Sequence, residues 1–412
     1  MADVVASTRP YTIAPVDGGI TAPRGFKSAA VHCGIKAKAG ALDLMVLAVD
    51  TFASVAAIFT TNLAKAAPVL VSKRHLEITH GTGCAIVVNS GCANACTGDE
   101  GMTHARRMAE EVALDLGCEP ERVLVASTGV IGVHLKMDRL VPGIHRACSN
   151  LAHGNGHDAA LAIMTTDPFP KEHAVTVTTA RGPFAIGGMA KGSGMIEPNM
   201  ATMLGFLTTD AQVAPALLQR ALAESARDTF NAITVDGECS TNDSLYAMAS
   251  GNSGVVVDDA LYPALLEGFL TVSRQLAIGI VRGGEGATKL IAVTVHGART
   301  LDDARQVART IANSPLVKTA VHGADPNWGR IVCAAGRSGV ALDINRVAVR
   351  IGGVLLFENG LPHDEAAPQA EAILKHDTVD IDLSLGAGEA AATIWGCDLS
   401  AEYVRINGEY RT

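Results

Sequence analysis

Hydrophobic and polar positions follow two different rhythms along this chain. Short, mainly apolar runs, at residues 84–88 and 122–126, are typical of buried strands. Between these two runs, apolar residues recur at helical spacing over 105–116, which predicts an amphipathic helix that ends at Gly117. A strand, a helix and a second strand in this order are typical of an α/β fold.

The same alternation continues through the second half of the chain. Pro215 is placed to open one helix, and apolar residues at helical spacing over 304–311 predict another. Apolar and polar residues alternate over 347–351 and again over 379–385, as they do in strands with one solvated face. We therefore expect an α/β chain with some antiparallel sheet, and no linker or internal repeat divides it.

Composition is that of a compact globular protein. The chain has 412 residues, of which 48% are hydrophobic and 18% charged, so it can bury a large core and divide into two halves. Its net charge of −9 disfavours a nucleic-acid partner, because phosphate binding relies on clustered Lys and Arg. The composition therefore favours small metabolites as ligands.

The sequence does not predict membrane insertion or secretion. The longest apolar run, residues 44–59, is interrupted by Asp50 and is shorter than a membrane-spanning helix. Residues 1–19 lack the basic start and apolar centre of a secretory signal. We therefore expect a cytoplasmic protein with no membrane partner.

The cysteines and histidines do not form a metal-binding motif. Nine cysteines are scattered along the chain without a C-x-x-C pair, which is typical of reduced thiols. Cys92 and Cys96 lie four positions apart, as do His153 and His157, but neither pair is joined by a second pair at zinc-like spacing. We therefore expect no metal ion.

Two glycine-rich loops, residues 190–194 and 282–289, invite comparison with nucleotide-binding motifs. Both lack the phosphate-loop spacing that ends in Gly-Lys-Ser/Thr, and both lack the G-x-G-x-x-G of dinucleotide sites. We therefore expect neither nucleotide hydrolysis nor a bound cofactor.

One hydroxyl group stands out in the middle of the chain. Residues 191–204 (KGSGMIEPNMATML) carry Thr202 into an apolar run directly after a glycine-rich turn. A threonine hydroxyl is a weak nucleophile unless a base activates it, and the α-amine of an N-terminal threonine is such a base. That chemistry requires a cut between Ala201 and Thr202. The local pattern alone favours a plainer interpretation, a β-branched residue on a strand.

Two polar loops follow predicted buried strands. Residues 89–98 (NSGCANACTG) follow the first, and residues 127–132 (STGVIG) end the second. Glycines in the second loop leave backbone N–H groups free to point into a cleft, which suits an oxyanion hole. Turn formation alone also explains both loops.

Residues 191–204 resemble the self-cleavage and nucleophile motif of the glutamate N-acetyltransferase / ornithine acetyltransferase family. Further segments that resemble the family run from end to end of the chain, so the match is not a local coincidence. They are residues 18–26 (GGITAPRGF), 59–62 (FTTN), 89–98, 236–243 (DGECSTND), 324–330 (ADPNWGR) and 403–412 (YVRINGEYRT). Cys92 and Gly408 depart from the residues common in the family, and neither position touches the implied chemistry.

The resemblance implies a fold, a division of the chain and an assembly. The implied fold is α/β, with the layered sheets and helices of the self-cleaving, N-terminal-nucleophile-like ornithine acetyltransferases. Residues 1–201 become an alpha chain and residues 202–412 a beta chain that begins with the nucleophile. Two copies of each chain are expected to assemble into a heterotetramer.

The resemblance also implies a reaction. Thr202 Oγ attacks the carbonyl of Ala201, and water then resolves the ester to give two chains. The freed α-amine, with an ordinary pKa of roughly 7.7–8.0, serves as the base for the Thr202 hydroxyl. Thr202 then takes the acetyl group from N-acetylornithine and passes it to glutamate in a ping-pong acyl transfer. Some family members also accept acetyl-CoA, and the motifs here do not separate the two types.

Site residues follow from the same resemblance. Thr128 and Gly129 match the oxyanion-hole pair. The matched substrate-binding residues are Thr165, Lys191, Thr202, Glu285, Asn407 and Thr412, with Thr166 as the neighbouring candidate for Thr165. Without the resemblance these positions read as a capped strand end, a solvated lysine, a turn carboxylate and a frayed tail.

Two other functions stay open at this point. An N-terminal-threonine amidase or aminopeptidase shares the self-cleavage but hands the acyl group to water. An uncleaved metabolite-binding protein keeps one intact chain. Transfer to glutamate separates the acetyltransferase from the amidase, and the mass of the purified chain separates both from the binding protein.

Overall fold

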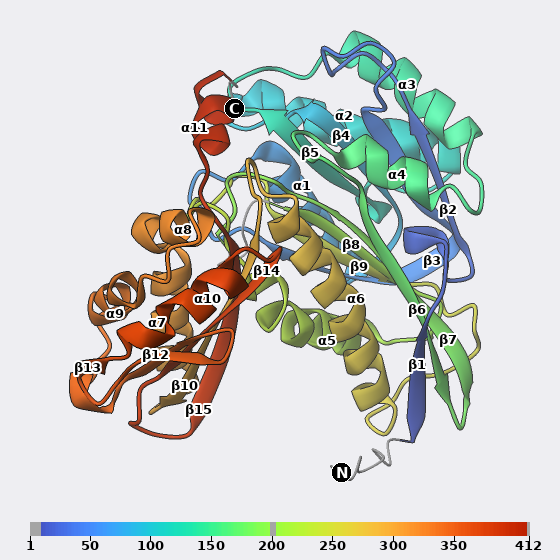
Figure 1. Cartoon of the computed structure of the whole chain (residues 1–412). Coiled ribbons are helices and arrows are strands. Elements are labelled where there is room, and N and C mark those ends of the chain that lie inside the picture. The colour runs from blue at the N-terminus through green and yellow to red at the C-terminus, as the bar shows by residue number, and fades with distance from the viewer. Residues whose placement is uncertain (1–9, 198–202, 410–412) are drawn as a thin grey trace.

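The structure, a computed structural model, describes residues 10–197 and 203–409 of the chain. In this part of the chain, two β-sheets are covered by helices, and the strands and helices alternate along the sequence (Figure 1). The α/β fold class predicted from the sequence is therefore confirmed, as is the presence of antiparallel sheet.

The larger sheet holds nine strands among the described residues. They are β1 (Tyr11–Pro15), β2 (Phe26–Val31), β3 (Leu44–Phe59), β4 (Thr82–Cys92), β5 (Val123–Val130), β6 (Lys171–Thr179), β7 (Gly182–Lys191), β8 (Leu204–Thr209) and β9 (Ser244–Ala249). Their order is β1-β6-β7-β8-β9-β3-β4-β5, and β2 pairs with β3. The β4–β5 and β8–β9 pairs are parallel, whereas the other pairs are antiparallel.

The smaller sheet comes entirely from the last third of the chain. Its strands are β10 (Leu290–Ala298), β11 (Ala348–Ile351), β12 (Val354–Glu358), β13 (Leu361–Pro362), β14 (Thr378–Ser384) and β15 (Ala390–Cys397). They run in the order β13-β12-β11-β14-β10-β15, with only β10 and β14 parallel among these pairs. In β14 the buried positions alternate with partly or fully exposed ones, as the sequence pattern predicted.

The described ranges contain eleven α-helices. They are α1 (Ala67–Thr79), α2 (Gly98–Leu116), α3 (Met137–Ser149), α4 (Gly156–Ile163), α5 (Pro215–Arg227), α6 (Tyr262–Arg282), α7 (Leu301–Ala312), α8 (Pro315–His322), α9 (Trp328–Gly336), α10 (Ala367–Leu374) and α11 (Ala401–Glu409). Short 3₁₀ helices span Gly19–Thr21, Pro120–Arg122, Phe230–Ala232, Ile344–Arg346 and Asp364–Ala366.

The predicted helix boundaries follow from local chemistry. Gly117 ends α2 in the left-handed conformation (φ 69°), which glycine adopts without steric cost. Pro215 opens α5 at a position where a missing N–H does no harm. In α7, the predicted apolar stripe is fully buried against the smaller sheet at Ala304, Val307 and Ile311. Both predicted strands, at 84–88 and 122–126, lie in β4 and β5 with an offset of one residue at the start of β5.

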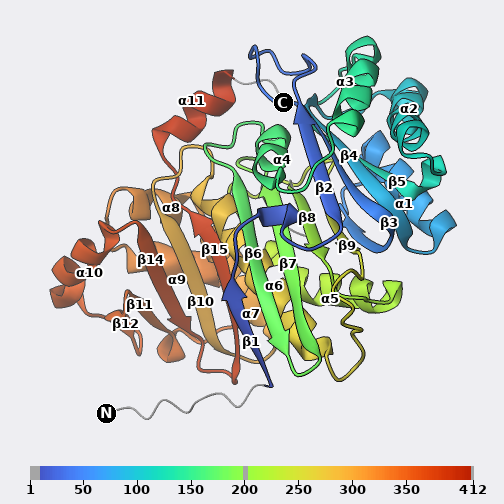
Figure 2. The same ribbon diagram turned by 90° about the vertical axis from the view of Figure 1, so that its right-hand side faces the viewer.

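The longest apolar segments belong to the core. Residues 44–59 form the strand β3, which pairs with β2, β4 and β9. One helix of the described residues, α6, is long and apolar enough to cross a membrane, but 56% of its most apolar window is buried. Figure 2 shows α6 behind the strands β6 and β7, where its buried face packs on the larger sheet. The helix α6 is therefore as buried as expected for a helix of the protein core.

Candidate active site

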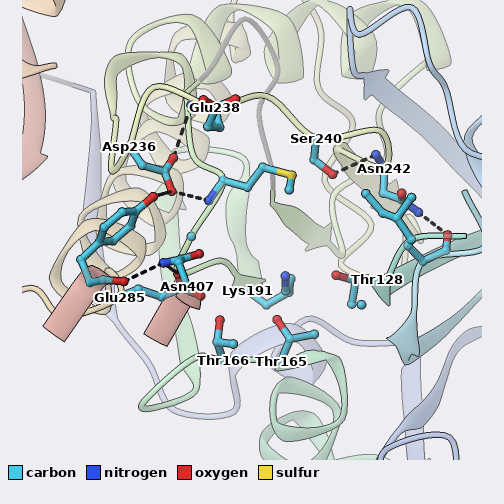
Figure 3. A pocket seen from close by; sticks show the side chains of 16 residues that line it. Thr128, Thr165, Thr166, Lys191, Asp236, Glu238, Ser240, Asn242, Glu285 and Asn407 are labelled. Atoms are coloured by element: carbon cyan, nitrogen blue, oxygen red, sulfur yellow. Dashed lines mark hydrogen bonds between the residues drawn. The ribbon is translucent and has the colours of Figure 1, made fainter. Parts of the chain in front are cut away.

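A pocket of about 130 Å³ opens where segments from both halves of the chain meet. Its lining comes from residues on either side of position 202, and Figure 3 shows the polar side chains that face it. The lining residues are Ala93, Thr128, Gly129, Ile131, Thr165, Thr166, Lys191, Gly194, Met195, Asp236, Glu238, Ser240, Asn242, Glu285, Tyr403 and Asn407.

Thr128 and Gly129 lie at the carboxyl end of β5, where it runs parallel to β4. Gly129 has φ 130°, and a Cβ atom there would lie 2.3 Å from the carbonyl carbon of Gly91. Only glycine fits this backbone conformation and this close approach between two strands. Figure 3 shows the hydroxyl of Thr128 turned toward the pocket. The two residues predicted as the oxyanion pair therefore form one wall.

Asn242 joins the second half of the chain to this wall. Its side-chain amide is buried and donates to the carbonyl oxygens of Ala93 at 2.6 Å and Ser127 at 2.9 Å. The hydroxyl of Ser127 in turn donates to Asn89 Oδ1 at 2.6 Å. These bonds fix the ends of β4 and β5 relative to each other, so the polar groups of residues 89–98 gather at the strand end as expected from the sequence.

Lys191 is the last residue of β7, and its backbone is paired with Leu204 at the start of β8. The side chain is buried and lines the pocket. This pairing sets the register of residue 204, two positions after Thr202, against the pocket wall. Ala201 and Thr202 themselves lie outside the described residues, as does Thr412.

Asp167 holds two lining segments of the pocket together. Its carboxylate accepts hydrogen bonds from the backbone N–H groups of Gly192 at 2.7 Å and Thr165 at 3.0 Å. It also accepts from Lys171 Nζ at 2.5 Å, and both side chains of this ion pair are almost fully buried, at 0% and 1% exposure. Burial raises the pKa of Asp167, but the ammonium groups of Lys171 and Lys191 hold it below its ordinary value. Asp167 is therefore a buried carboxylate anion.

Thr165 and Thr166 both line the pocket. They follow α4, and the backbone of Thr165 is fixed by Asp167. In Figure 3 both hydroxyl groups point toward the side of the pocket where Lys191 lies. The geometry therefore admits both threonines as substrate contacts, and the prediction for Thr165 stays a prediction.

Asp236 fixes the segment that precedes position 202. Its two carboxylate oxygens accept from the backbone N–H groups of Met195 at 2.6 Å and Ile196 at 2.8 Å. Met195 has φ 59°, a left-handed conformation that a residue with a side chain adopts only when its surroundings hold it there. The hydroxyl of Tyr403 donates to the same carboxylate at 3.2 Å.

Glu285 and Asn407 meet at the far side of the pocket from Thr128 (Figure 3). The side chain of Asn407 donates to Glu285 Oε2 at 2.8 Å, and the N–H of Glu285 donates to the carbonyl oxygen of Ser193 at 3.0 Å. A Cβ atom on Gly194 would lie 2.4 Å from Glu285 Oε2, so a side chain at position 194 would displace this carboxylate. Because Tyr403 and Asn407 are one turn apart on α11, this helix brings the C-terminal segment to the pocket.

Asp243 is buried next to Met203, the residue that follows Thr202. Burial holds the pKa of its carboxyl well above the ordinary value, although nearby Lys191 and the N–H groups of Met203 and Ser240 act in the opposite direction. The carbonyl oxygen of Met203 accepts from Ser244 N–H at 3.1 Å. The chain is thus anchored on both sides of Met203 as it enters β8.

The structure brings six predicted residues to the same pocket: Thr128, Gly129, Thr165, Lys191, Glu285 and Asn407. Sequence reasoning did not assign site roles to five other polar lining residues, namely Asp236, Glu238, Ser240, Asn242 and Tyr403. The dense polar run at 236–243 was a usable signal, since such a run beside buried strands needs hydrogen-bond partners. The buried partners Asp167 and Lys171 gave no comparable signal.

Comparison with known proteins agrees with the resemblance seen in the sequence. The family model described as the ArgJ family matches residues 27–412. The arginine biosynthesis bifunctional protein ArgJ of Dehalococcoides mccartyi is 49% identical over 400 residues, which cover 96% of this chain and 98% of that protein. The protein of the same name from Symbiobacterium thermophilum is 49% identical over 401 residues, covering 96% and 99%.

A solved structure is also similar to this chain. It is the ornithine acetyltransferase of Mycobacterium tuberculosis in complex with ornithine, with 38% identity and a TM-score of 0.41, and it covers 47% of this chain and 100% of its own. The match of the family model over most of the chain, together with relatives that are matched over almost their whole length, identifies the family. The chain belongs to the ArgJ family.

Proposed function

We propose that this enzyme transfers the acetyl group of N-acetylornithine to glutamate, giving ornithine and N-acetylglutamate. Membership of the ArgJ family supports an acyltransferase, and the names of the relatives support arginine biosynthesis as its setting. The observation that carries the proposal is the pairing of Lys191 with Leu204, which sets the register of β8 beside a pocket that holds Thr128, Gly129 and Glu285. Thr202 precedes this strand by two residues.

The proposed reaction begins with self-cleavage. Thr202 Oγ adds to the Ala201 carbonyl, the peptide nitrogen leaves as the new α-amine, and water hydrolyses the resulting ester. In each turnover that amine takes the proton of the Thr202 hydroxyl as Oγ attacks the acetyl carbon. Ornithine leaves with a proton, and the amine of glutamate then takes the acetyl group from the ester. The hydroxyl of Thr128 and the N–H of Gly129 stabilise the oxyanion in each step.

The charges around the pocket suit amino-acid substrates. Lys191 lies between Thr128 on one side and the Glu285–Asn407 pair on the other (Figure 3). We assign Lys191 to a substrate carboxylate and Glu285 to a substrate ammonium group. Both side chains are buried, and the attraction between opposite charges is stronger at buried positions than in water. Thr165 or Thr166, Asn407 and Thr412 complete the proposed substrate contacts.

The proposal includes the two-chain form and its assembly. Residues 1–201 form an alpha chain, residues 202–412 form a beta chain, and two of each make a cytoplasmic heterotetramer. The lining of the pocket by residues on both sides of position 202 supports one site shared by both chains. Use of acetyl-CoA as a second acetyl donor is supported by the word bifunctional in the relatives' names and stays a prediction.

Incubation of the purified protein with N-acetylornithine, with and without glutamate, tests the proposed reaction. We expect ornithine and N-acetylglutamate in equal amounts when glutamate is present, and little turnover without it, because the acetyl ester then lacks its acceptor. Acetate formed without N-acetylglutamate would instead identify the amidase. A chain that binds these compounds without converting them would be a metabolite-binding protein.

Replacing Thr128 by valine tests the oxyanion wall. Valine keeps the shape of threonine but lacks its hydroxyl, and we expect kcat to fall on the order of 10²–10³-fold if this hydroxyl is an oxyanion donor. The exposed Thr178 on β6 offers the matched control, since Thr178→Val should leave kcat unchanged. Equal activity of the Thr128→Val variant and the wild type, measured on fully cleaved protein, would remove Thr128 from the oxyanion hole.

A further inference from the structure

Three side chains that commonly bind metal ions meet outside the pocket, between α2 and the loop that leaves β5. Glu100 and His104 lie one turn apart on α2, and His134 lies between β5 and α3. One ligand atom from each residue lies within 4.8 Å of the other two. In the described part of the chain, no other group of His, Cys, Asp and Glu meets this condition.

The distances within this cluster are close to those of a metal site. His104 Nε2 and His134 Nδ1 each lie 3.7 Å from the same oxygen, Glu100 Oε1. The two imidazole rings are perpendicular, with their centroids 6.1 Å apart. Ligand atoms bound to a tetrahedral Zn²⁺ at its usual bond lengths stand about 3.4 Å from one another. Both carboxylate–imidazole distances are therefore within a few tenths of an ångström of this spacing, and all three ligand atoms lie within 4.8 Å of one another.

Hydrogen bonding does not account for the placement of His104. Its side chain is only 18% exposed, and its Nδ1 atom is buried without a hydrogen-bond partner among the described residues. A buried imidazole nitrogen is normally paired, so the ring is held here without that compensation. A bond from Nε2 to a cation would orient the ring, and the ring proton would then reside on Nδ1, the atom that lacks a protein partner.

We propose that Glu100, His104 and His134 bind one Zn²⁺ ion or a similar borderline divalent cation, with water in the fourth position. Two imidazoles and a carboxylate match the preferences of these ions. The pairs that stand out in the sequence, Cys92 with Cys96 and His153 with His157, do not belong to this cluster, so no metal was expected. The fold instead joins an i, i+4 pair on α2 to a histidine thirty positions further along the chain.

The proposed ion would connect α2 to the loop that follows the oxyanion wall. His134 follows Gly129 by five positions, and this loop is already joined to the segment before α2 through Gly132 N–H, which donates to the carbonyl oxygen of Ala95 at 2.9 Å. A metal bond across the same gap would restrict the loop further. Binding of the ion should therefore raise the thermal midpoint of the folded protein, because it binds the folded arrangement only.

Calorimetric titration with Zn²⁺ tests the proposal on the full-length, self-processed protein. The protein must be tag-free and treated with a chelator, because a polyhistidine tag binds the same ions. We expect one site per chain of 412 residues and a higher thermal midpoint with Zn²⁺. His104→Gln and His134→Gln should each lose this binding, while their thermal midpoints without metal stay at the wild-type value.

His145→Gln is the matched control, because His145 contacts two carboxylates, Glu111 and Asp115, without a second histidine. This variant should bind Zn²⁺ as the wild type does. Titration with Co²⁺ tests the ligand type, since imidazole and carboxylate ligands give no thiolate charge-transfer band whereas the exposed Cys96 would. Unchanged binding in both histidine variants, loss of binding in Cys96→Ser, or no binding by the wild type would each overturn the proposal.

Discussion

Replacing Thr202 by alanine is expected to leave one uncut chain of 412 residues without acetyltransferase activity. The substitution removes the hydroxyl that attacks Ala201, so the peptide bond stays intact and no α-amine is released to serve as base. In a hydrolase whose catalytic residues were removed one at a time, loss of the nucleophile alone lowers kcat about 10⁶-fold. Denaturing gel electrophoresis and an assay for N-acetylglutamate measure the two consequences.

Thr202→Ser supplies the control for this variant. Serine retains a hydroxyl at the same position, so the variant should still cut itself and retain measurable transfer. The alanine variant must remain folded, which circular dichroism and its thermal midpoint can establish. If Thr202→Ala protein were still divided at the same bond, the assigned cleavage site and the role of the hydroxyl would both be wrong.

Replacing Asp167 by asparagine should damage both stability and catalysis. The buried Lys171 would lose its counter-charge, and removing one partner of a buried ion pair costs about 3–5 kcal/mol. The amide also cannot accept three hydrogen bonds as the carboxylate does, so the segments at Thr165 and Gly192 would move apart. Urea unfolding measures the first effect, and a raised KM for N-acetylornithine measures the second.

Two further variants separate the effects of Asp167. Glu371→Gln removes an exposed ion pair with Lys375 at the same i, i+4 spacing and should change stability by no more than about 0.5 kcal/mol. The double variant Asp167→Leu, Lys171→Met replaces the buried pair by apolar groups and should recover most of the stability but not the low KM. Wild-type KM in the double variant would show that Asp167 does not position the pocket.

The elements that sequence reasoning predicted correctly are those decided by local chemistry. Gly117 ends α2 because a left-handed residue closes the helix, and Pro215 opens α5 because its missing N–H is harmless there. The strand order was not predictable in this way. β9 lies between β8 and β3 only because residues far apart in the sequence pack together, and local periodicity carries no information about such pairing.

The pocket shows the same division between local and distant signals. The glycine at 129 stands out in the sequence, and the structure gives its reason in the approach of Gly91. The role of Asp167 could not be seen, because Gly192 becomes its neighbour only after β7 has folded, and nothing in the sequence marks its local contacts with Thr165 and Lys171 as buried. Asn242 is a similar case, since it contacts the ends of β4 and β5 from a loop more than a hundred positions later.

The central claim is that the chain cuts itself before Thr202 and thereby creates its nucleophile. Intact-mass analysis of the purified wild-type protein, combined with N-terminal sequencing of its fragments, tests this most directly. We predict two noncovalently associated fragments, one ending at Ala201 and the other beginning at Thr202. A fully active protein that remains a single uncut chain, or whose second fragment begins at another residue, would contradict it.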